Sequence, residues 1–507
     1  MRKPYLILFI LFFLSTVCFS QNLSWEWAVG LGGSKSDEVY DITGDNYGNI
    51  YVTGAFLDSS ITAGQLTLNV NAYYGAYLAK FDSSGNPIWI RGASSTQVTY
   101  GYSVVTDNKE AVYLYGSFQD GLQFPSDSLA GNKTFIAKYD TAGNFQWVKT
   151  YARPEGKLSI DNSGNLYLAG SPDYISKLDS SGNVIWYHNS GSVWIMDIAH
   201  DSNGNIYMTG LVSSSTILGA DTLVTYGDND LITIKMDSSG SILWAKSTGS
   251  SGSDWGYSIE VDAVGNCYVV CFDIDYNPFY FMGNVINPPS SLAFVLKYDS
   301  AGNGQWIKDI YGVDLSLDSH ANIYVGGWAV NNLVFGNTTI SNNVARDFAI
   351  FQLDSAGNEK ACIYTGNSKP CGFSTIHIDK DDNIYAGGTF YDTVFFGGSV
   401  VQNYAQSSKD IAVVRISISN IITSVKENSR RAINIFPNPA NQYIKIGDQF
   451  VGEFSICNSV GDIVLTSDYN SKHGLIDISS LDDGFYILKF TDENHLVHSS
   501  KFVKISE

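Results

Sequence analysis

Charged residues are scarce in this sequence, and basic ones scarcer still. Only 16% of the 507 residues are charged, and 50 acids face 30 bases for a formal net charge of −20. The densest basic run, Lys426 to Arg431, is short. Because a nucleic-acid-binding surface must offset phosphate charge with clustered Lys and Arg, nucleic acid is excluded as a partner.

Long apolar runs are missing after the first twenty residues. Arg2 and Lys3 precede an apolar run from Tyr5 to Leu14, and small and polar residues follow as far as Ser20. That run is too short to cross a bilayer, so residues 1–20 are predicted to be a cleaved signal peptide. The mature chain is then exported, with no integral membrane segment.

Cysteine and histidine are also rare, at 6 and 7 residues. Five cysteines survive signal removal, an odd number that does not form a dense disulfide framework. Cys362 and Cys371 flank a loop and either pair or stay as thiols. No histidine has a partner at metal-ligand spacing, and no local catalytic motif occurs.

Aromatic residues and glycine are plentiful, which is typical of short strands joined by tight turns. The decapeptide DNYGNIYVTG at 45–54 returns as DNSGNLYLAG at 161–170 and DSNGNIYMTG at 201–210. Its tyrosine, the anchor tyrosine of each repeat, recurs every 40 to 62 residues. The seven anchors are Tyr51, Tyr113, Tyr167, Tyr207, Tyr268, Tyr324 and Tyr385. Such a period indicates a propeller rather than a helical repeat.

A second motif follows each anchor, as in KFDSSGNPIW at 80–89. In both motifs, alternating residues stand on either side of the turn sequence Asp-x-x-Gly-Asn. Each motif therefore predicts a hairpin, and each repeat contains two hairpins and four strands. The last repeat lacks its Trp strand, whereas the chain begins with one at 25–30. We therefore predict an all-β fold: a monomeric seven-bladed β-propeller over 21–417, with the N-terminal strand closing the last blade.

The two motifs resemble the bacterial seven-bladed propeller repeats of secreted proteins. After a linker at 418–431, residues 432–507 contain INIFPNPANQYIKI, DGFYILKF and KFVKI. They resemble the type A C-terminal sorting domain of the type IX secretion system of Bacteroidota. This resemblance implies a small β-sandwich recognised by the translocon, and a protein released or attached to the outer-membrane surface. The matching positions are Pro437, Asn438, Pro439, Gly484, Tyr486, Lys489, Lys501 and Lys504.

The variable loops connect successive blades and join the second strand of a blade to the third. They lie together on one face, and binding usually resides in variable loops on a rigid scaffold. The candidate ligand-binding residues are aromatics that occur in these loops in particular blades only, together with one neighbouring acidic residue. They are Tyr100, Tyr102, Trp194, Trp255 and Asp254.

The regular residues favour structural roles. The Asp of each turn forms that turn, and the repeated Trp, for example Trp89, packs between blades. Asp273, Asp275 and Asn277 are spaced like the start of a calcium loop, but Pro278 and Asn284 stand where Gly and Glu belong. Hence no cofactor is expected, with calcium as an open possibility. The favoured hypothesis is a surface-displayed binding protein for a glycan or protein. The alternative is a propeller enzyme, either a quinoprotein-like dehydrogenase or a polysaccharide lyase or hydrolase.

Overall fold

The computed structural model describes residues 19–422 and 435–506, apart from short internal gaps. Those gaps are 71–73, 96, 108, 125–126, 152–155, 171–173, 190–192, 274–277, 282, 287–292, 337, 341–345, 367–368, 406–407, 447–450, 459–462, 471–474 and 493–496. Most of the predicted signal peptide, residues 1–18, lies outside the described residues. So do Asp275, Asn277 and residues 423–431 of the predicted linker.

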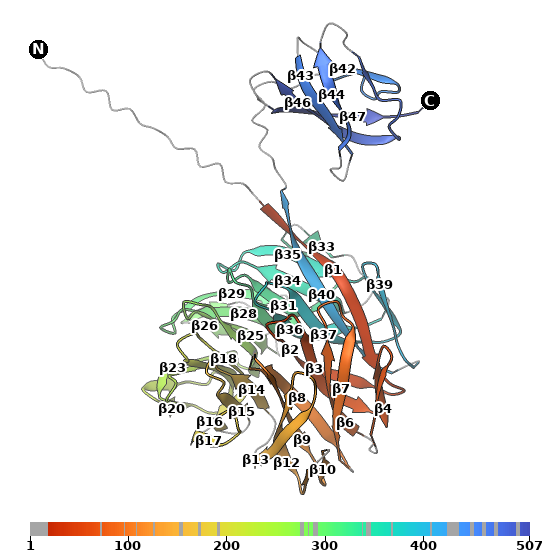
Figure 1. Cartoon of the computed structure of the whole chain (residues 1–507). Helices are drawn as coiled ribbons and strands as arrows, with labels where there is room; N and C mark the ends of the chain where they lie inside the picture. Colours follow the sequence, from red (N-terminus) through yellow and green to blue (C-terminus); the bar gives the residue numbers. More distant parts are fainter. Residues whose placement is uncertain are drawn as a thin grey trace, which may run out of the picture. The chain divides into compact units, whose positions relative to one another are not determined.

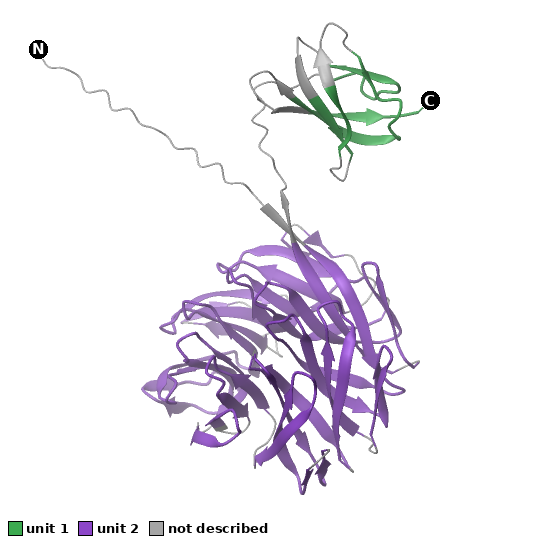
Figure 2. Cartoon of the chain, viewed as in Figure 1, with its two compact units in different colours: residues 1–20, 421–507 green, residues 21–420 purple. Residues whose placement is uncertain are grey.

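The chain divides into two compact units, residues 21–420 and a second that comprises residues 1–20 and 421–507 (Figure 2). The described residues of both are all-β, and among them no helix is long and apolar enough to cross a membrane. Figure 1 shows the larger unit as a succession of sheets that follow one another along the chain.

In the described ranges the larger unit contains seven sheets built on four strands each. Sheet 1 pairs β2 (Asp37–Gly44), β3 (Ile50–Leu57), β6 (Tyr74–Phe81) and β7 (Pro87–Ser94) in that order. Sheet 2 pairs β8 (Thr99–Thr106), β9 (Ala111–Phe118), β12 (Lys133–Asp140) and β13 (Phe145–Tyr151). Sheet 3 pairs β14 (Gly156–Ile160), β15 (Leu166–Gly170), β16 (Tyr174–Leu178) and β17 (Val184–His188).

The remaining four sheets repeat this order. Sheet 4 pairs β18 (Val193–His200), β19 (Ile206–Val212), β22 (Asp230–Met236) and β23 (Ile242–Thr248). Sheet 5 pairs β24 (Asp254–Val261), β25 (Cys267–Asp273), β28 (Ala293–Tyr298) and β29 (Gly304–Ile310). Sheet 6 pairs β30 (Gly312–Leu317), β31 (Ile323–Ala329), β34 (Asp347–Leu353) and β35 (Glu359–Tyr364). Sheet 7 pairs β36 (Gly372–Ile378), β37 (Ile384–Phe390), β40 (Asp410–Ile422) and β1 (Phe19–Gly32).

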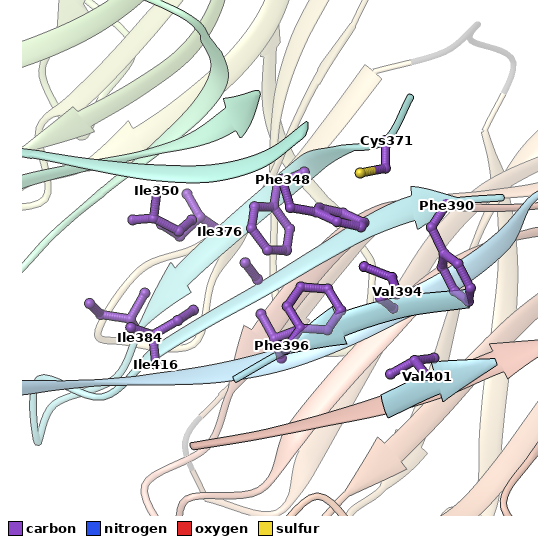
Figure 3. Packing of buried hydrophobic residues seen from close by; sticks show 14 of the residues in the cluster. Phe348, Ile350, Cys371, Ile376, Ile384, Phe390, Val394, Phe396, Val401 and Ile416 are labelled. Atoms are coloured by element: carbon purple, nitrogen blue, oxygen red, sulfur yellow. The ribbon is translucent and has the colours of Figure 1, made fainter. Parts of the chain in front are cut away.

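Sheet 7 is therefore assembled from both ends of the unit. Ser24 Oγ lies 2.8 Å from Ser417 Oγ, and Arg415 of β40 forms a 3.1 Å ion pair with Glu26 of β1. Trp25 of β1 packs edge-on against Phe396, with ring centroids 5.0 Å apart. Figure 3 shows the core beneath, where Phe348 of sheet 6 meets Phe396. Hydrophobic burial thus joins the first strand to the last sheet.

Small hairpins join the second and third strands of the sheets on the face opposite the Asp-x-x-Gly-Asn turns. They are β4 (Ser60–Ala63) with β5 (Leu66–Asn69), β10 (Leu122–Gln123) with β11 (Ser128–Leu129), β20 (Thr216–Leu218) with β21 (Asp221–Leu223), β26 (Phe279–Phe281) with β27 (Asn284–Ile286), β32 (Val334–Phe335) with β33 (Thr338–Thr339), and β38 (Thr393–Phe396) with β39 (Ser399–Gln402). The described part of sheet 3 has none.

The Asp-x-x-Gly-Asn turns form as the sequence predicts. Asp45 Oδ1 accepts the N–H groups of Tyr47 and Asn49, and Gly48 takes a positive φ of 77°. The hydroxyl of the anchor Tyr51 also donates to Asp45 Oδ2, at 3.0 Å. The anchor tyrosine therefore fastens its turn as well as filling the core.

The repeated Trp packs between sheets, as predicted. Trp89 is 5% exposed, and its Nε1 donates to the carbonyl of Thr141 in the next sheet. A Cβ on Gly143 would lie 2.9 Å from the indole, so this glycine provides both the positive φ and the close approach. Trp244 and Trp306 make the same bond, to Ser300 and Ser355.

The C-terminal unit has a four-stranded and a three-stranded sheet in its described residues. The first pairs β44 (Ile463–Asn470), β43 (Val451–Cys457), β46 (Gly484–Asp492) and β47 (Val497–Lys504) in that order. The second pairs β41 (Ile435–Phe436), β42 (Tyr443–Ile446) and β45 (Ile476–Asp477). Ile444, Ile456 and Leu488 from both sheets share one buried core.

Candidate functional site

The first strands of the sheets form a closed circle of contacts. Each first strand touches the first strand of the next sheet, and β36 of sheet 7 touches β2 of sheet 1. One residue in each of these strands stands ten positions before the anchor tyrosine. We call this set the channel ring: Asp41, Ser103, Lys157, Asp197, Ser258, Asp314 and Thr375.

The channel ring lies at the centre of this circle. Lys157 of sheet 3 and Asp41 of sheet 1, which are not neighbouring sheets, form an ion pair of 3.1 Å. Six of the seven first strands shift register just before their ring residue. Only β14, which carries Lys157, pairs without such a shift in the described residues. These shifts are β-bulges, which turn a side chain and free a backbone N–H.

The ring carboxylates accept hydrogen bonds from backbone N–H groups of neighbouring first strands. Asp41 accepts from Val104 N, Asp197 from Ile259 N and Asp314 from Ile376 N, each at 2.8 Å and each from another sheet. Ser103 Oγ donates to Asp41, and Ser258 Oγ donates to Asp314, both at 2.7 Å. The ring is therefore a set of hydrogen bonds that ties neighbouring first strands together.

The ring holds three carboxylates and one ammonium group. Burial would lower the pKa of Lys157, but Asp41, Asp197 and Asp314 outweigh burial and raise it. Burial, together with Asp314, raises the pKa of Asp197 to about 7 against the opposing charge of Lys157. Burial likewise raises the pKa of Asp314. The ring therefore keeps its cation while one carboxyl group titrates near neutral pH.

A cavity of about 520 Å³ opens on the side of the ring where the variable loops lie. Its aromatic lining comes from Tyr40, Tyr257, Trp328 and Phe373, and the ring residues Lys157, Asp197 and Asp314 contribute charged groups. Arg346 also lines it and lies over the Trp328 ring, 4.5 Å from the centroid. Aromatic surfaces around a few polar groups are typical of ligand sites. We call this space the aromatic cavity.

A second cavity of about 530 Å³ lies towards the Asp-x-x-Gly-Asn turns. Glu260 and His377, two residues after ring positions, contribute to its lining. Burial raises the pKa of Glu260 to about 8 and lowers the pKa of His377. Asp262 and Asp379, which also line this cavity, accept hydrogen bonds within their own turns. The described lining residues of this cavity include no Phe, Tyr or Trp, so we favour the aromatic cavity.

None of the five predicted ligand-binding residues lines the aromatic cavity, but three of them contact residues that do. Tyr100 and Tyr102 stack on each other at 5.7 Å, and both contact Tyr40. Trp255 stacks on Tyr257 at 6.1 Å. These three residues thus support two walls of the cavity.

The other two predicted residues differ in exposure. Trp194 is 47% exposed, and it precedes the lining residue Met196 by two positions on β18. Asp254 is fully buried and accepts the N–H of Ser250 at 2.5 Å. No ligand is present to test these five assignments, which stay predictions.

Sequence reasoning missed the channel ring and the aromatics that line the cavity. The signal for the ring was available, since each ring residue has the same offset from its anchor tyrosine. The aromatics Tyr40 and Tyr257 stand one position earlier still, beside the bulges of β2 and β24. A bulge changes which side chain faces the channel, and the alternation pattern of the sequence does not predict where a bulge occurs.

The cysteines, and any larger cluster of metal-ligating side chains, can be placed in the described residues. In the part of the chain that the structure describes, no group of three or more His, Cys, Asp or Glu residues is arranged to hold a metal ion. Cys362 and Cys371 are not joined in a disulfide.

The predicted sorting residues divide into buried and exposed sets. Asn438 accepts from Val503 N and donates to the carbonyl of Lys501, so the Pro437–Pro439 segment is fastened to β47. Tyr486 is buried and stacks on Phe502, and Lys504 is 4% exposed. Lys489 and Lys501 are exposed. Gly484 begins β46.

These features define the class: an all-β, β-propeller repeat protein with a separate C-terminal unit. Residues 434–505 match the family of secretion system C-terminal sorting domains. The protein therefore carries a type IX secretion sorting domain, which indicates export and contact with the translocon.

Two curated relatives match part of this chain. One is an uncharacterized WD repeat-containing protein, L264, of Acanthamoeba polyphaga mimivirus, 22% identical over 46% of this chain and 18% of its own length. The other is the regulatory protein FlaEY of Caulobacter vibrioides, 26% identical over 37% of this chain and 20% of its own. The chain thus spans about a fifth of either relative. Among solved structures, BamB from Moraxella catarrhalis matches 78% of this chain and 97% of its own at 11% identity and a TM-score of 0.35.

Proposed function

We propose that this chain is an exported seven-bladed β-propeller that binds a glycan in the aromatic cavity. The seven consecutive sheets, and the contact of the last with the first, support the blade number. We also propose that the C-terminal unit folds as a β-sandwich, supported by its two sheets around one core. After export the protein is released or held at the outer-membrane surface.

The lining of the aromatic cavity carries the glycan assignment. Tyr40, Tyr257 and Trp328 offer rings on which the C–H faces of sugars stack, and Asp197, Asp314 and Lys157 offer acceptors and a donor to hydroxyl groups. A protein ligand would instead be expected to bury a wide, flat surface around the mouth.

The test is binding of the full chain to an array of bacterial and host glycans, followed by calorimetry with each hit. Tyr257→Ala should lower affinity at least tenfold, because it removes a wall, while Tyr187→Ala should leave it unchanged. Tyr187 is 62% exposed on β17 and does not line the cavity. Trp255→Ala should have an intermediate effect, since Trp255 supports Tyr257. Equal losses in Tyr257→Ala and Tyr187→Ala would contradict the site.

The same samples address the enzyme alternative. Reducing ends released from a bound polysaccharide, or dye reduction with an added quinone cofactor, would favour catalysis. Binding without turnover would favour recognition alone.

A further inference from the structure

Two buried carboxyl groups meet where sheet 7 joins sheet 1. Asp410 begins β40, Asp37 begins β2, and both are fully buried. Asp37 N donates to the carbonyl of Lys409, which places the starts of the two strands side by side. Burial raises the pKa of Asp37 to about 8, and the charge of Asp410 is the second cause of this rise.

Each carboxyl group has one oxygen held by the backbone and one without a partner. Asp37 Oδ2 accepts from Gly33 N at 2.7 Å, and Asp410 Oδ2 accepts from Tyr404 N. Asp37 Oδ1 and Asp410 Oδ1 are buried and have no hydrogen-bond partner. No cation is among the groups that shift the pKa of either residue. A buried carboxylate oxygen without a donor carries a large desolvation cost, so two at one interface point to a bound positive charge.

A glycine leaves room for this meeting. A Cβ on Gly32 would lie 2.6 Å from Asp410 Oδ1, and one on the next residue, Gly33, would lie 3.7 Å from Asp37 Oδ2. Both carboxyl groups therefore approach the same short stretch of backbone.

The arrangement recurs where sheet 4 joins sheet 5. The loop TGSSGSD at 248–254 matches LGGSKSD at 31–37, so Gly249 corresponds to Gly32 and Asp254 to Asp37. A Cβ on Gly249 would lie 1.9 Å from Asp230 Oδ1 and 2.9 Å from Asp254 Oδ2, and the separation of these oxygens cannot exceed the sum of the two distances. Asp230 Oδ1 is again buried without a hydrogen-bond partner.

A third interface shows what happens when the second acid is absent. The loop TGNSKPC at 365–371 has the same pattern, but Cys371 stands in the place of Asp37. There Asp347 accepts hydrogen bonds from Thr365 Oγ1, Gly366 N and, at 3.4 Å, Cys371 Sγ. The single carboxyl group here accepts three hydrogen bonds from the protein, whereas Asp37, Asp410 and Asp230 each keep one buried oxygen that accepts none. Figure 3 shows Cys371 near Phe348 at this interface.

We propose that Asp37 and Asp410 bind one calcium ion between the last sheet and the first. Asp230 and Asp254 bind a second between sheets 4 and 5. Calcium takes carboxylate, carbonyl and water oxygens at about 2.3–2.6 Å, so one ion fits between two facing carboxylates and completes its shell from loop carbonyls and water. Magnesium is smaller and holds its water, which makes it a poor bridge here. The sites are separate from the proposed glycan site and do not depend on it.

The test is calcium titration of the full chain, stripped with a chelating resin, by calorimetry and elemental analysis. Wild type should bind two calcium ions, and its Tm should rise by several degrees in millimolar calcium but not in equal magnesium. Asp410→Asn and Asp230→Asn should each bind one ion, and the double variant none. Asp347→Asn, the matched control at the third interface, should still bind two.

Three results would overturn the proposal. Wild type that binds no calcium at millimolar concentration would show that the unpartnered oxygens carry protons instead. Two ions retained by the double variant, or one lost in Asp347→Asn, would place the ions elsewhere. If Asp410→Asn does not fold, the wild-type stoichiometry and Asp230→Asn decide.

Discussion

Replacing Lys157 with methionine removes the only cation of the channel ring and leaves Asp41, Asp197 and Asp314 to face one another. The 3.1 Å ion pair with Asp41 corresponds to about 5 kcal/mol of gross attraction at an effective dielectric constant of about 20. Desolvation of the ammonium group offsets part of this. The Lys157 side chain is 27% exposed, so its ion pair is intermediate between a buried and a surface pair. We therefore expect Lys157→Met to lower the free energy of unfolding by about 2–3 kcal/mol at pH 8.

The loss should depend on pH, and its sign follows from Asp197. The pKa of Asp197 is about 7 in the folded chain against 3.8 in the unfolded one, so between these values the folded state binds the extra proton. Stability therefore falls as pH rises through this window. At pH 5 Asp197 is protonated with or without Lys157, and the cost of Lys157→Met should shrink to about 1 kcal/mol.

Urea unfolding followed by tryptophan fluorescence measures this directly, because all ten tryptophans lie within residues 21–420. Lys360→Met is the control: Lys360 pairs with Asp354 at 2.8 Å, but its side chain is 44% exposed. The pKa of Asp354 is lowered to about 2, so its contribution is present above 3.8 and constant from pH 5 to 8. We expect Lys360→Met to lower the free energy of unfolding by less than about 1 kcal/mol at both pH values. A Lys157→Met loss that is equal at pH 5 and pH 8, or no larger than the control, would refute the ring electrostatics.

Two further predictions concern the ends of the chain. Trp27→Ala should destabilise the propeller unit by about 2–3 kcal/mol in the same urea assay. The reason is that partly buried Trp27 packs on Tyr385 and donates to the carbonyl of Ser83 in sheet 1. An unchanged midpoint would mean that β1 does not close the last sheet in solution. Deleting 432–507 should leave the protein in the periplasm of a type IX-competent host. Lys489 is exposed on β46, so the Lys489→Ala variant should fold normally, and a failure of its export would not be due to unfolding. Continued export of the truncated chain, detected by immunoblotting of the medium and cell surface, would contradict the sorting role.

The turns were predictable because each depends on residues close in sequence, and the Trp contacts were predictable because the Trp recurs at the same place in successive repeats. Asp45, Gly48 and Asn49 determine one turn locally, and the motif is repeated often enough to be recognised. The strand order follows from the same repeats. Closure of sheet 7 was also predictable, since a Trp strand without a partner stood at one end and a repeat without its Trp strand at the other.

The ligand-binding residues were harder to predict for a physical reason. Tyr100, Tyr102 and Trp255 were chosen because they break the repeat, and they do lie beside the aromatic cavity. Which ring lines the cavity depends on the bulges of the first strands and on contacts between sheets distant in sequence. Tyr40 is an example, since its neighbours Tyr100 and Tyr102 belong to the next sheet.

The most degenerate repeat supplies the residue on which the charge of the channel depends. Sheet 3 has the shortest spacing, and its described residues contain no small hairpin between the second and third strands and no register shift in the first strand, β14. Without the bulge, β14 places Lys157 rather than an acid or hydroxyl at the ring position, within reach of Asp41 across the channel. An acid there would add a fourth carboxylate to a site where burial already raises the pKa of Asp197 and Asp314. Lys157 thus offsets the charge of the three ring carboxylates, and it also lines the aromatic cavity.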